Sequence, residues 1–372
     1  MVRKRRYIKP KLTRTHKKNR LNFVLDQVDR STQRLPDFLN SAHGDEKWFY
    51  MMKDGQICRV FPDRQGQYRF PRSPKIYHKS RMPKVMVLAV CARPRPEYGF
   101  DGRIGMWSFT IERLAKRSDR RTGVVAGQTT ILEDVTVDAS AYRKKIIAKG
   151  GVFEAIREKM WWYHKAARYD LDASGCRKPS GELVSGTWRF SRMRGTPCAE
   201  AGQSLLYQHD GARPHTAKEN HRAFACQSKT KGFSLCVVTQ PAQSPDVDVN
   251  DLAFFNSLQS DVSLVAKENR QELLAAILDC WREYPAEKME SVWRCLHNSY
   301  HGILESGGGN EYPRHRGSRT AHRSDIESCR AVTAEALTAA ECALVALSSD
   351  VSDCDSSRPE AATSESEESD SD

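Results

Sequence analysis

The chain has 372 residues, of which 39 % are hydrophobic, and a formal net charge of +12. A chain of this length and composition can bury a core and form one large domain or two ordinary ones. Its longest apolar run, Val85 to Ala92, is far too short to cross a bilayer, so we expect no membrane partner. Its eleven cysteines include no Cys-x-x-Cys pair and no zinc-finger spacing, which argues against a zinc-binding module.

Positive charge is spread unevenly along the chain. Residues 1–20 hold ten Lys and Arg residues and no acid, whereas residues 350–372 hold nine acids and one Arg. The middle still carries +10 (12 − 10 + 8), and a basic body of this size favours a nucleic-acid partner over a basic protein without one. The run RKRR (Arg3 to Arg6) is typical of a nuclear import signal or of an arm that touches phosphates, so we expect the protein in the nucleus.

We expect DNA contacts from this arm and from two further places. The run KRSDRRTG (Lys116 to Gly123) fits phosphate contact and a solvated loop about equally well. Arg213 lies three residues after Asp210. His215, close to it, could lie near the site or contact DNA, but a structural histidine is the better interpretation. The candidate DNA-binding residues are Arg3, Lys4, Arg5, Arg6, Lys9, Lys11, Arg117, Arg120, Arg121 and Arg213.

The first third of the chain predicts one helix and three strands. Apolar residues at 21, 24, 25 and 28 have helical spacing, which predicts a helix over 17–28. The aromatic-rich run 45–52 predicts a first strand, and after a Lys-Asp-Gly turn the run 56–61 can return as the second. The run 84–92 predicts a third, central strand. Consecutive strands joined by turns predict an antiparallel start to a sheet.

The rest of the chain alternates helices with strands. Two more strands are expected over 204–210 and 233–240, and helices over 141–166 (apart from Gly150 and Gly151), 216–230, 250–266, 270–284 and 286–306. Three strands, helix, strand, helix, strand and further helices is the order of a ribonuclease-H-like α/β fold, a mixed sheet with helices on both faces. Residues 167–202 are rich in turn formers and lack periodicity, which predicts an inserted loop.

Composition and pattern divide the chain into three parts. We expect a basic arm with a short helix over residues 1–40. The ribonuclease-H-like domain follows over residues 41–317, with its inserted loop at about 167–202. Residues 318–372 form a C-terminal extension that ends in a disordered, acidic, Ser-rich tail, because such a composition cannot bury a core.

Three carboxylates fall at the ends of predicted elements. Asp45 starts the first strand, Asp210 ends the fourth, and Asp251 opens the helix after the fifth. Carboxylates are hard oxygen ligands suited to Mg²⁺ or Mn²⁺. Three of them gathered from distant parts of a chain can hold two such ions about 4 Å apart, which serves phosphoryl transfer without a covalent nucleophile. The sequence therefore predicts a two-metal site, although Asp45 taken alone could be an ordinary turn acid.

The other two acids also have ordinary interpretations. Asp210 could cap the helix that follows it, although Thr216 is the better candidate for that cap. Asp251 could compensate a helix dipole, and Asp246 and Asp248 compete with it nearby.

Three short segments resemble the catalytic boxes of mariner-type DNA transposases. They are GDEKWF, QHDGARPHTA and QSPDVDVND, which carry Asp45, Asp210 and Asp251. FDGRIGMWSF (100–109) and ARPR (92–95) resemble the plant and water-mould branch of mariner-like elements, in which the third acid is Asp. The likeness runs from about Tyr7 to Gly317 and skips residues 167–202. Three boxes in the right order are a specific signal, whereas any one alone would be weak.

The resemblance implies a cut-and-paste transposase. Such an enzyme hydrolyses a phosphodiester bond at an element end and joins the freed 3′ hydroxyl to target DNA. It implies that Asp45, Asp210 and Asp251 are the catalytic residues and hold Mg²⁺ or Mn²⁺, with two ions expected. It also implies double-stranded DNA partners, namely terminal inverted repeats and target, and a homodimer.

The chain also departs from the family pattern. Gly211 stands where the second box usually has Asn, and Asp248 where the third usually has Asn. Family members carry two helix-turn-helix units upstream of the linker at which this likeness begins, so we expect this copy to lack that region. Two other functions stay open: a catalytically inactive or host-adopted DNA-binding relic, and a ribonuclease-H-like nuclease that acts on RNA–DNA hybrids.

Overall fold

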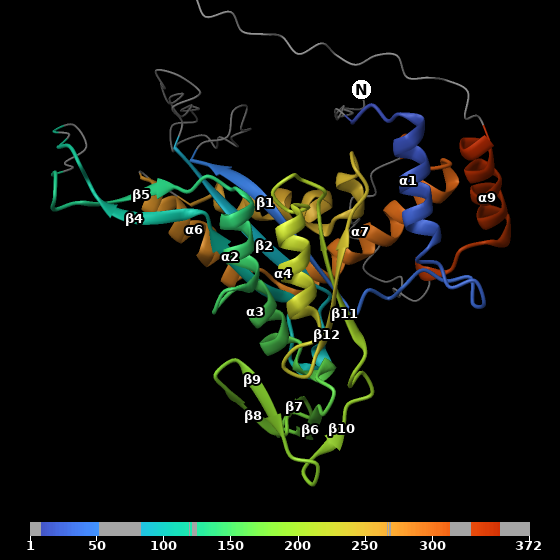
Figure 1. Ribbon diagram of the computed structural model, residues 1–372, viewed down its shortest axis with the longest axis horizontal. Coiled ribbons are helices and arrows are strands. Elements are labelled where there is room, and N and C mark those ends of the chain that lie inside the picture. Colours follow the sequence, from blue (N-terminus) through green and yellow to red (C-terminus); the bar gives the residue numbers. More distant parts are fainter. Residues whose placement is uncertain are drawn as a thin grey trace, which may run out of the picture.

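A five-stranded mixed sheet forms the centre of the molecule (Figure 1). The computed structural model describes residues 9–51, 83–118, 120, 125–265, 267, 269–312 and 329–349. Strands β1, β2 and β3 pair antiparallel, β1 pairs parallel with β11, and β11 with β12, which gives the order β12-β11-β1-β2-β3. Their bounds are Ser41–Tyr50 (β1), Lys84–Ala92 (β2), Arg103–Ser108 (β3), Ser204–His209 (β11) and Ser234–Thr239 (β12).

The strands near the N-terminus differ in part from the expectation. Strand β1 begins four residues earlier than expected, so Asp45 lies in its interior, opposite Ala89 of β2, and not at its start. The expected central strand is β2. Strand β3 was not predicted, and the strand expected over 56–61 lies outside the described residues. The sheet nevertheless starts with an antiparallel arrangement, as predicted.

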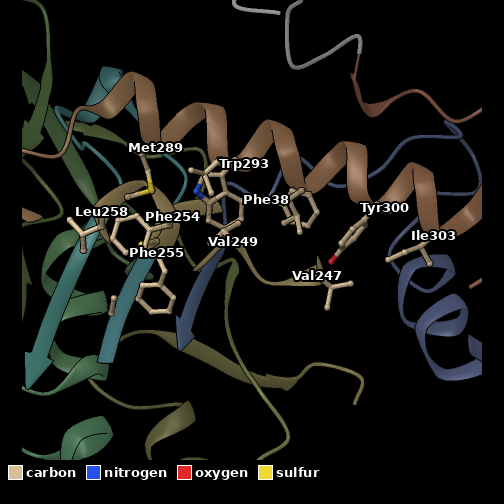
Figure 2. Packing of buried hydrophobic residues seen from close by; sticks show 14 of the residues in the cluster. Phe38, Val247, Val249, Phe254, Phe255, Leu258, Met289, Trp293, Tyr300 and Ile303 are labelled. Carbon is tan, nitrogen blue, oxygen red and sulfur yellow. The ribbon is translucent and has the colours of Figure 1, made fainter. Parts of the chain in front are cut away.

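One face of the sheet is covered by helices from both ends of the chain. Figure 2 shows α7 lying across this core, with Phe38, Phe254, Trp293 and Tyr300 packed beneath it. Helix α1 begins at Arg14, three residues before the expected start, because Thr13 caps it by accepting from the backbone N–H of His16 at 3.2 Å. The helices are Arg14–Leu25 (α1), Phe255–Val262 (α5), Arg270–Arg282 (α6), Ala286–Glu305 (α7) and Ala334–Ser349 (α9).

The opposite face is covered by α2 (Ala139–Ile147), α3 (Val152–Lys159) and α4 (Lys218–Ser228), which lie in front of the sheet in Figure 1. The helical segment expected over 141–166, apart from Gly150 and Gly151, is two separate helices in the structure. Gly150 adopts a left-handed backbone with φ of 73°, which ends α2 and lets α3 start in a new direction. A 3₁₀ turn over Trp161–Tyr163 ends the segment, and its aromatic side chains are buried.

The segment expected to be an inserted loop contains five short strands. Strands β10 (Thr196–Pro197), β6 (Arg168–Leu171) and β7 (Arg177–Pro179) form a small sheet, and β8 (Gly181–Val184) and β9 (Thr187–Phe190) form a hairpin. The hairpin turns at Ser185 and Gly186, both with positive φ, as two-residue turns require.

This small unit is attached to the body by hydrogen bonds. The indole Nε1 of Trp188 donates to the carbonyl of Arg157 at 3.0 Å, and Tyr98 Oη donates to Glu200 at 2.7 Å. Arg95 also pairs with Glu200. The unit is therefore packed against the body of the domain.

A second hairpin, β4 (Thr110–Leu114) with β5 (Thr130–Asp134), projects from the edge of the molecule (Figure 1). Arg270 of α6 ties its base by donating to the carbonyl of Leu132 at 3.1 Å. In the part of the chain that the structure describes, no helix is both long and apolar enough to cross a membrane.

Candidate metal-binding acidic site

Asp45 and Asp210 are brought level with each other by the pairing of β1 with β11. Ser41 lies opposite Leu206 and His43 opposite Gln208 in this parallel pair. Extending that register by two residues places Asp45 beside Asp210. Asp210 directly follows the last residue of β11, which is why a carboxylate follows an apolar strand here.

Asp251 reaches the same edge through a loop fixed from within. After a 3₁₀ turn over Pro245–Val247, the Asp248 Oδ1 atom accepts from the backbone N–H of Asn250 at 2.7 Å and of Asp251 at 3.4 Å. The Asn250 side chain donates to the carbonyl of His43 in β1 at 3.0 Å. Asp251 then lies in a single π-helical turn, Asn250–Phe254, that leads into α5.

Buried polar residues behind the acids join this loop to both strands. Gln208 donates from Nε2 to the carbonyl of Val247 at 2.8 Å, and His43 Nδ1 lies 3.5 Å from Asp248 Oδ2. Sequence reasoning missed His43, Gln208 and Asn250. A signal existed for two of them, because His43 and Gln208 each lie two residues before a box acid, and residues two apart share a face of a strand.

Mutual repulsion shows that the carboxylates lie close together. Burial and the charges of Asp248 and Asp251 raise the pKa of Asp45 well above its usual range. Partial desolvation and the charge of Asp248 raise the pKa of Asp251 to about 6, and Asp210 adds to that effect. Lys47 and a hydrogen bond with Asp45 oppose it. Acids in this situation gain from a nearby cation.

Asp210 is in a different electrostatic state, because a histidine lies against it. Burial acts to raise the pKa of Asp210, but its contact with His215 outweighs burial and the pKa is lowered. His215 is buried between Asp210 and Glu46. Burial would lower the pKa of His215, but pairing with these two acids raises it to about 9. The structure thus places His215 at the site as well as in the core.

Asp210 does not cap the helix that follows it. Its Oδ1 accepts from the backbone N–H of Ala212 at 3.0 Å, six residues before α4 begins at Lys218. The expectation that Thr216 caps this helix is also wrong, since Ala217 holds the cap position without a side-chain hydrogen bond. The Thr216 hydroxyl instead donates back to the carbonyl of Ala212 at 3.2 Å.

The carboxylate oxygens of these acids suit a hard divalent ion, although they do not form a closed set of ligands. Among the described residues, no group of three or more His, Cys, Asp or Glu side chains is arranged to hold a metal ion. Mg²⁺ does not need such a cage, because it usually binds one or two carboxylates and completes its shell with water and substrate phosphates. Asp45, Asp210 and Asp251 could supply oxygen ligands of that kind, and a cation would relieve the repulsion that raises the pKa of Asp45 and Asp251.

The candidate DNA-binding residues lie in several places. Lys11, Arg117, Arg120 and Arg213 are exposed. Lys9 is half-buried and donates to the carbonyls of Asn310 and Tyr312, so it is held within the molecule. Arg3, Lys4, Arg5, Arg6 and Arg121 lie outside the described residues.

The topology, with its mixed sheet and helices on both faces, defines a ribonuclease-H-like α/β fold. No protein-family profile matches the chain. No curated protein matches it either.

Solved structures of the Mos1 transposase are similar to this chain in fold. The Mos1 mariner paired-end complex with Mn has a TM-score of 0.50 and 14% sequence identity, over 84% of this chain and 68% of that one. The catalytic domain of Mos1 mariner transposase has a TM-score of 0.45 and 14% identity, over 82% of this chain and 100% of that one. The Mos1 strand transfer complex has a TM-score of 0.47 and 16% identity, over 84% and 67%.

Proposed function

We propose that this chain is the catalytic domain of a mariner-like DNA transposase of the all-Asp branch. The observation that carries the proposal is the meeting of Asp45, Asp210 and Asp251, from three sequence boxes, at one edge of the sheet. The order and spacing of those boxes support it. The likeness in fold to the Mos1 paired-end complex is consistent with it.

In the proposed reaction, Asp45, Asp210 and Asp251 would hold two divalent ions. When bound there, Mg²⁺ or Mn²⁺ supplies the charge that activates a water or a 3′ hydroxyl and stabilises the leaving oxygen. The protein holds the three acids in fixed positions. The hydrogen bonds of Asp248 and Asn250 fix the loop that carries Asp251, and the pairing of β1 with β11 fixes the other two acids. Rigid positioning of this kind is what in-line displacement requires.

The partners in this proposal are the inverted-repeat ends of the element and target DNA. Arg213 is exposed three residues after Asp210, so it is placed to contact a phosphate near the cleaved bond. Lys11, Arg117 and Arg120 would hold more distant parts of the duplex. We further propose that the protein acts in the nucleus and as a homodimer.

The test is a nicking assay on duplex DNA that carries the element's own ends, with Mg²⁺ or Mn²⁺. Wild type is expected to nick the duplex only with metal, and Asp210→Asn is expected to abolish nicking. Asp279→Asn, the same change on the exposed surface of α6, is the matched control and should nick like wild type.

Other outcomes of this assay would contradict the proposal. Salt-sensitive DNA binding without nicking would identify a DNA-binding relic. Cleavage of RNA–DNA hybrids in preference to duplex DNA would identify a nuclease of the same fold.

A further inference from the structure

His215 lies between two acids that come from different strands of the sheet. Its Nδ1 is 2.5 Å from Asp210 Oδ1, and its Nε2 is 3.4 Å from Glu46 Oε1. The histidine and Glu46 side chains are only 5% and 8% exposed. The contact with Asp210 is short but is not directed as an aligned hydrogen bond, so we treat it as an ion pair. Both ring nitrogens are thus used by carboxylates.

The imidazole is held rigidly in this position. Its ring stacks on Tyr142 of α2 with ring centroids 3.8 Å apart. The Tyr142 hydroxyl in turn lies 3.3 Å from that of Tyr207, and the His215 backbone N–H donates to the carbonyl of Ala212 at 2.9 Å. A ring packed in this way cannot swing aside without disrupting the core on this face.

Glu46 links this pair to the strand that carries Asp45. Neighbouring side chains of a strand point to opposite faces, so Asp45 and Glu46 leave β1 on opposite sides of the sheet. Strand β1 therefore carries one proposed ligand, Asp45, on one face of the sheet. On the other face its Glu46 contacts His215, which pairs with the second proposed ligand, Asp210. The spacing between the two ligands is then set by one rigid element.

Both contacts that fix Asp210 are made by the same oxygen. Oδ1 accepts from the Ala212 backbone N–H at 3.0 Å and pairs with His215. The Oδ2 atom is then the oxygen left to face a cation. We propose that His215 and Glu46 are positioning residues, which hold Asp210 through Oδ1 so that Oδ2 can bind the divalent ion. This inference rests on the proposed function.

Mn²⁺ binding by the full-length protein, followed by the electron paramagnetic resonance signal of free Mn²⁺, tests the proposal without DNA. Partners that orient a metal ligand typically contribute about 10- to 100-fold to metal affinity. His215→Ala is therefore expected to weaken Mn²⁺ binding by about that factor. Added imidazole, which can refill the space above Tyr142, should restore part of the affinity. A histidine that only packs would give no such recovery of metal binding.

Two further variants separate positioning from loss of structure. His164→Ala is the matched control, because it removes another buried imidazole, which packs against Phe190 and Phe233. It should bind Mn²⁺ as wild type does. His215→Asn keeps a donor near the position of Nδ1 and should weaken binding less than His215→Ala. Circular dichroism spectra of every variant establish that it is folded.

The role of Glu46 is tested by a double-mutant cycle. If Glu46 acts through His215, then Glu46→Ala combined with His215→Ala should weaken Mn²⁺ binding no more than His215→Ala alone. Additive losses would overturn the proposed link between Glu46 and His215.

The positioning role of His215 and the metal site itself can be tested separately. Unchanged Mn²⁺ affinity in folded His215→Ala, with normal binding by wild type, would overturn the positioning role and leave the metal site standing. Absence of Mn²⁺ binding by folded wild type would overturn the metal site of the proposed function, and this inference with it.

Discussion

Individual buried histidines show how strongly position decides charge in this protein. His215 lies between two carboxylates, and its pKa is raised to about 9. His164 is buried between the rings of Phe190 and Phe233, and burial lowers its pKa. Its Nδ1 also accepts from the backbone N–H of Ala166 at 3.1 Å, which requires that nitrogen to be unprotonated. The same side chain is thus a cation in one place and neutral in another.

The neutral state of His164 predicts a pH dependence of folding. Its pKa in the folded protein is below the usual 6.5, so acid protonates the unfolded chain first. The stability that His164 contributes is present above pH 6.5 and is lost as the pH falls from there through the folded pKa. His164→Asn keeps an acceptor for Ala166 and removes the titration. The difference in unfolding free energy between wild type and this variant should therefore shrink from pH 7.5 to pH 5.

Urea unfolding at several pH values measures this difference. His221→Asn, a change at an exposed histidine of α4, should leave the pH dependence as in wild type. Parallel stability curves for wild type and His164→Asn would show that His164 is not held neutral by burial.

At the scale of elements, a buried ion pair ties α1 to the loop that carries the third box. Arg20 is fully buried and pairs with Asp246 through two hydrogen bonds of 2.5 and 2.8 Å. It also donates to the carbonyls of Gly308 and Gly309 at 3.0 and 3.1 Å. Helix α1, the third box and the segment after α7 therefore share one charged centre.

Removal of one partner should be costly. Arg20→Met leaves Asp246 buried without its cation and is expected to destabilise the fold by about 3–5 kcal/mol. Arg30→Met is the matched control. Arg30 pairs with Glu341 at the surface, where both side chains are about half exposed, and such a pair contributes only about 0–1 kcal/mol. Equal losses of unfolding free energy in the two variants would show that the buried pair contributes no more stability than the exposed one.

Elements with a strong local signal were predictable from the sequence. The apolar run of β2 and the helical periodicity of α6 and α7 each reflect burial on a face that the sequence displays. The short strands of residues 167–202 carry no such signal, because none of their residues is buried and so none shows an apolar face. Strand β3 was missed because Gly105 interrupts the apolar residues Ile104 and Met106, so the run shows no clear alternation.

The acids of the site were found for a different reason. They stand in boxes whose order can be recognised, and the strand register then places Asp45 level with Asp210. Of their supports, His43 could have been found from its place two residues before Asp45. Asn250 could not, because one-dimensional spacing does not show which polar residue will be buried beside which backbone group.

At the scale of the whole molecule, a chain with a net positive charge carries a cluster of acids at one edge of its sheet. The chain carries +12, yet the sheet edge gathers carboxylates that repel one another. A polyanion attracted by the basic surface would meet this edge with its phosphates, and only a divalent cation between them makes that contact favourable. If nucleic acid is the substrate, a divalent cation bound at this edge would offset the repulsion between the carboxylates and the phosphates.

Asp45, Asp210 and Asp251 are proposed to form one metal centre. Titration calorimetry of the full-length protein with Mn²⁺ tests it most directly. We predict that wild type binds Mn²⁺. Asp→Asn at each of the three positions should weaken binding by at least about tenfold, because loss of a residue that only orients a metal ligand already weakens binding about 10- to 100-fold. Asp279→Asn should bind as wild type does. Mn²⁺ binding that is unchanged in all three folded variants would show that these acids do not form a metal centre.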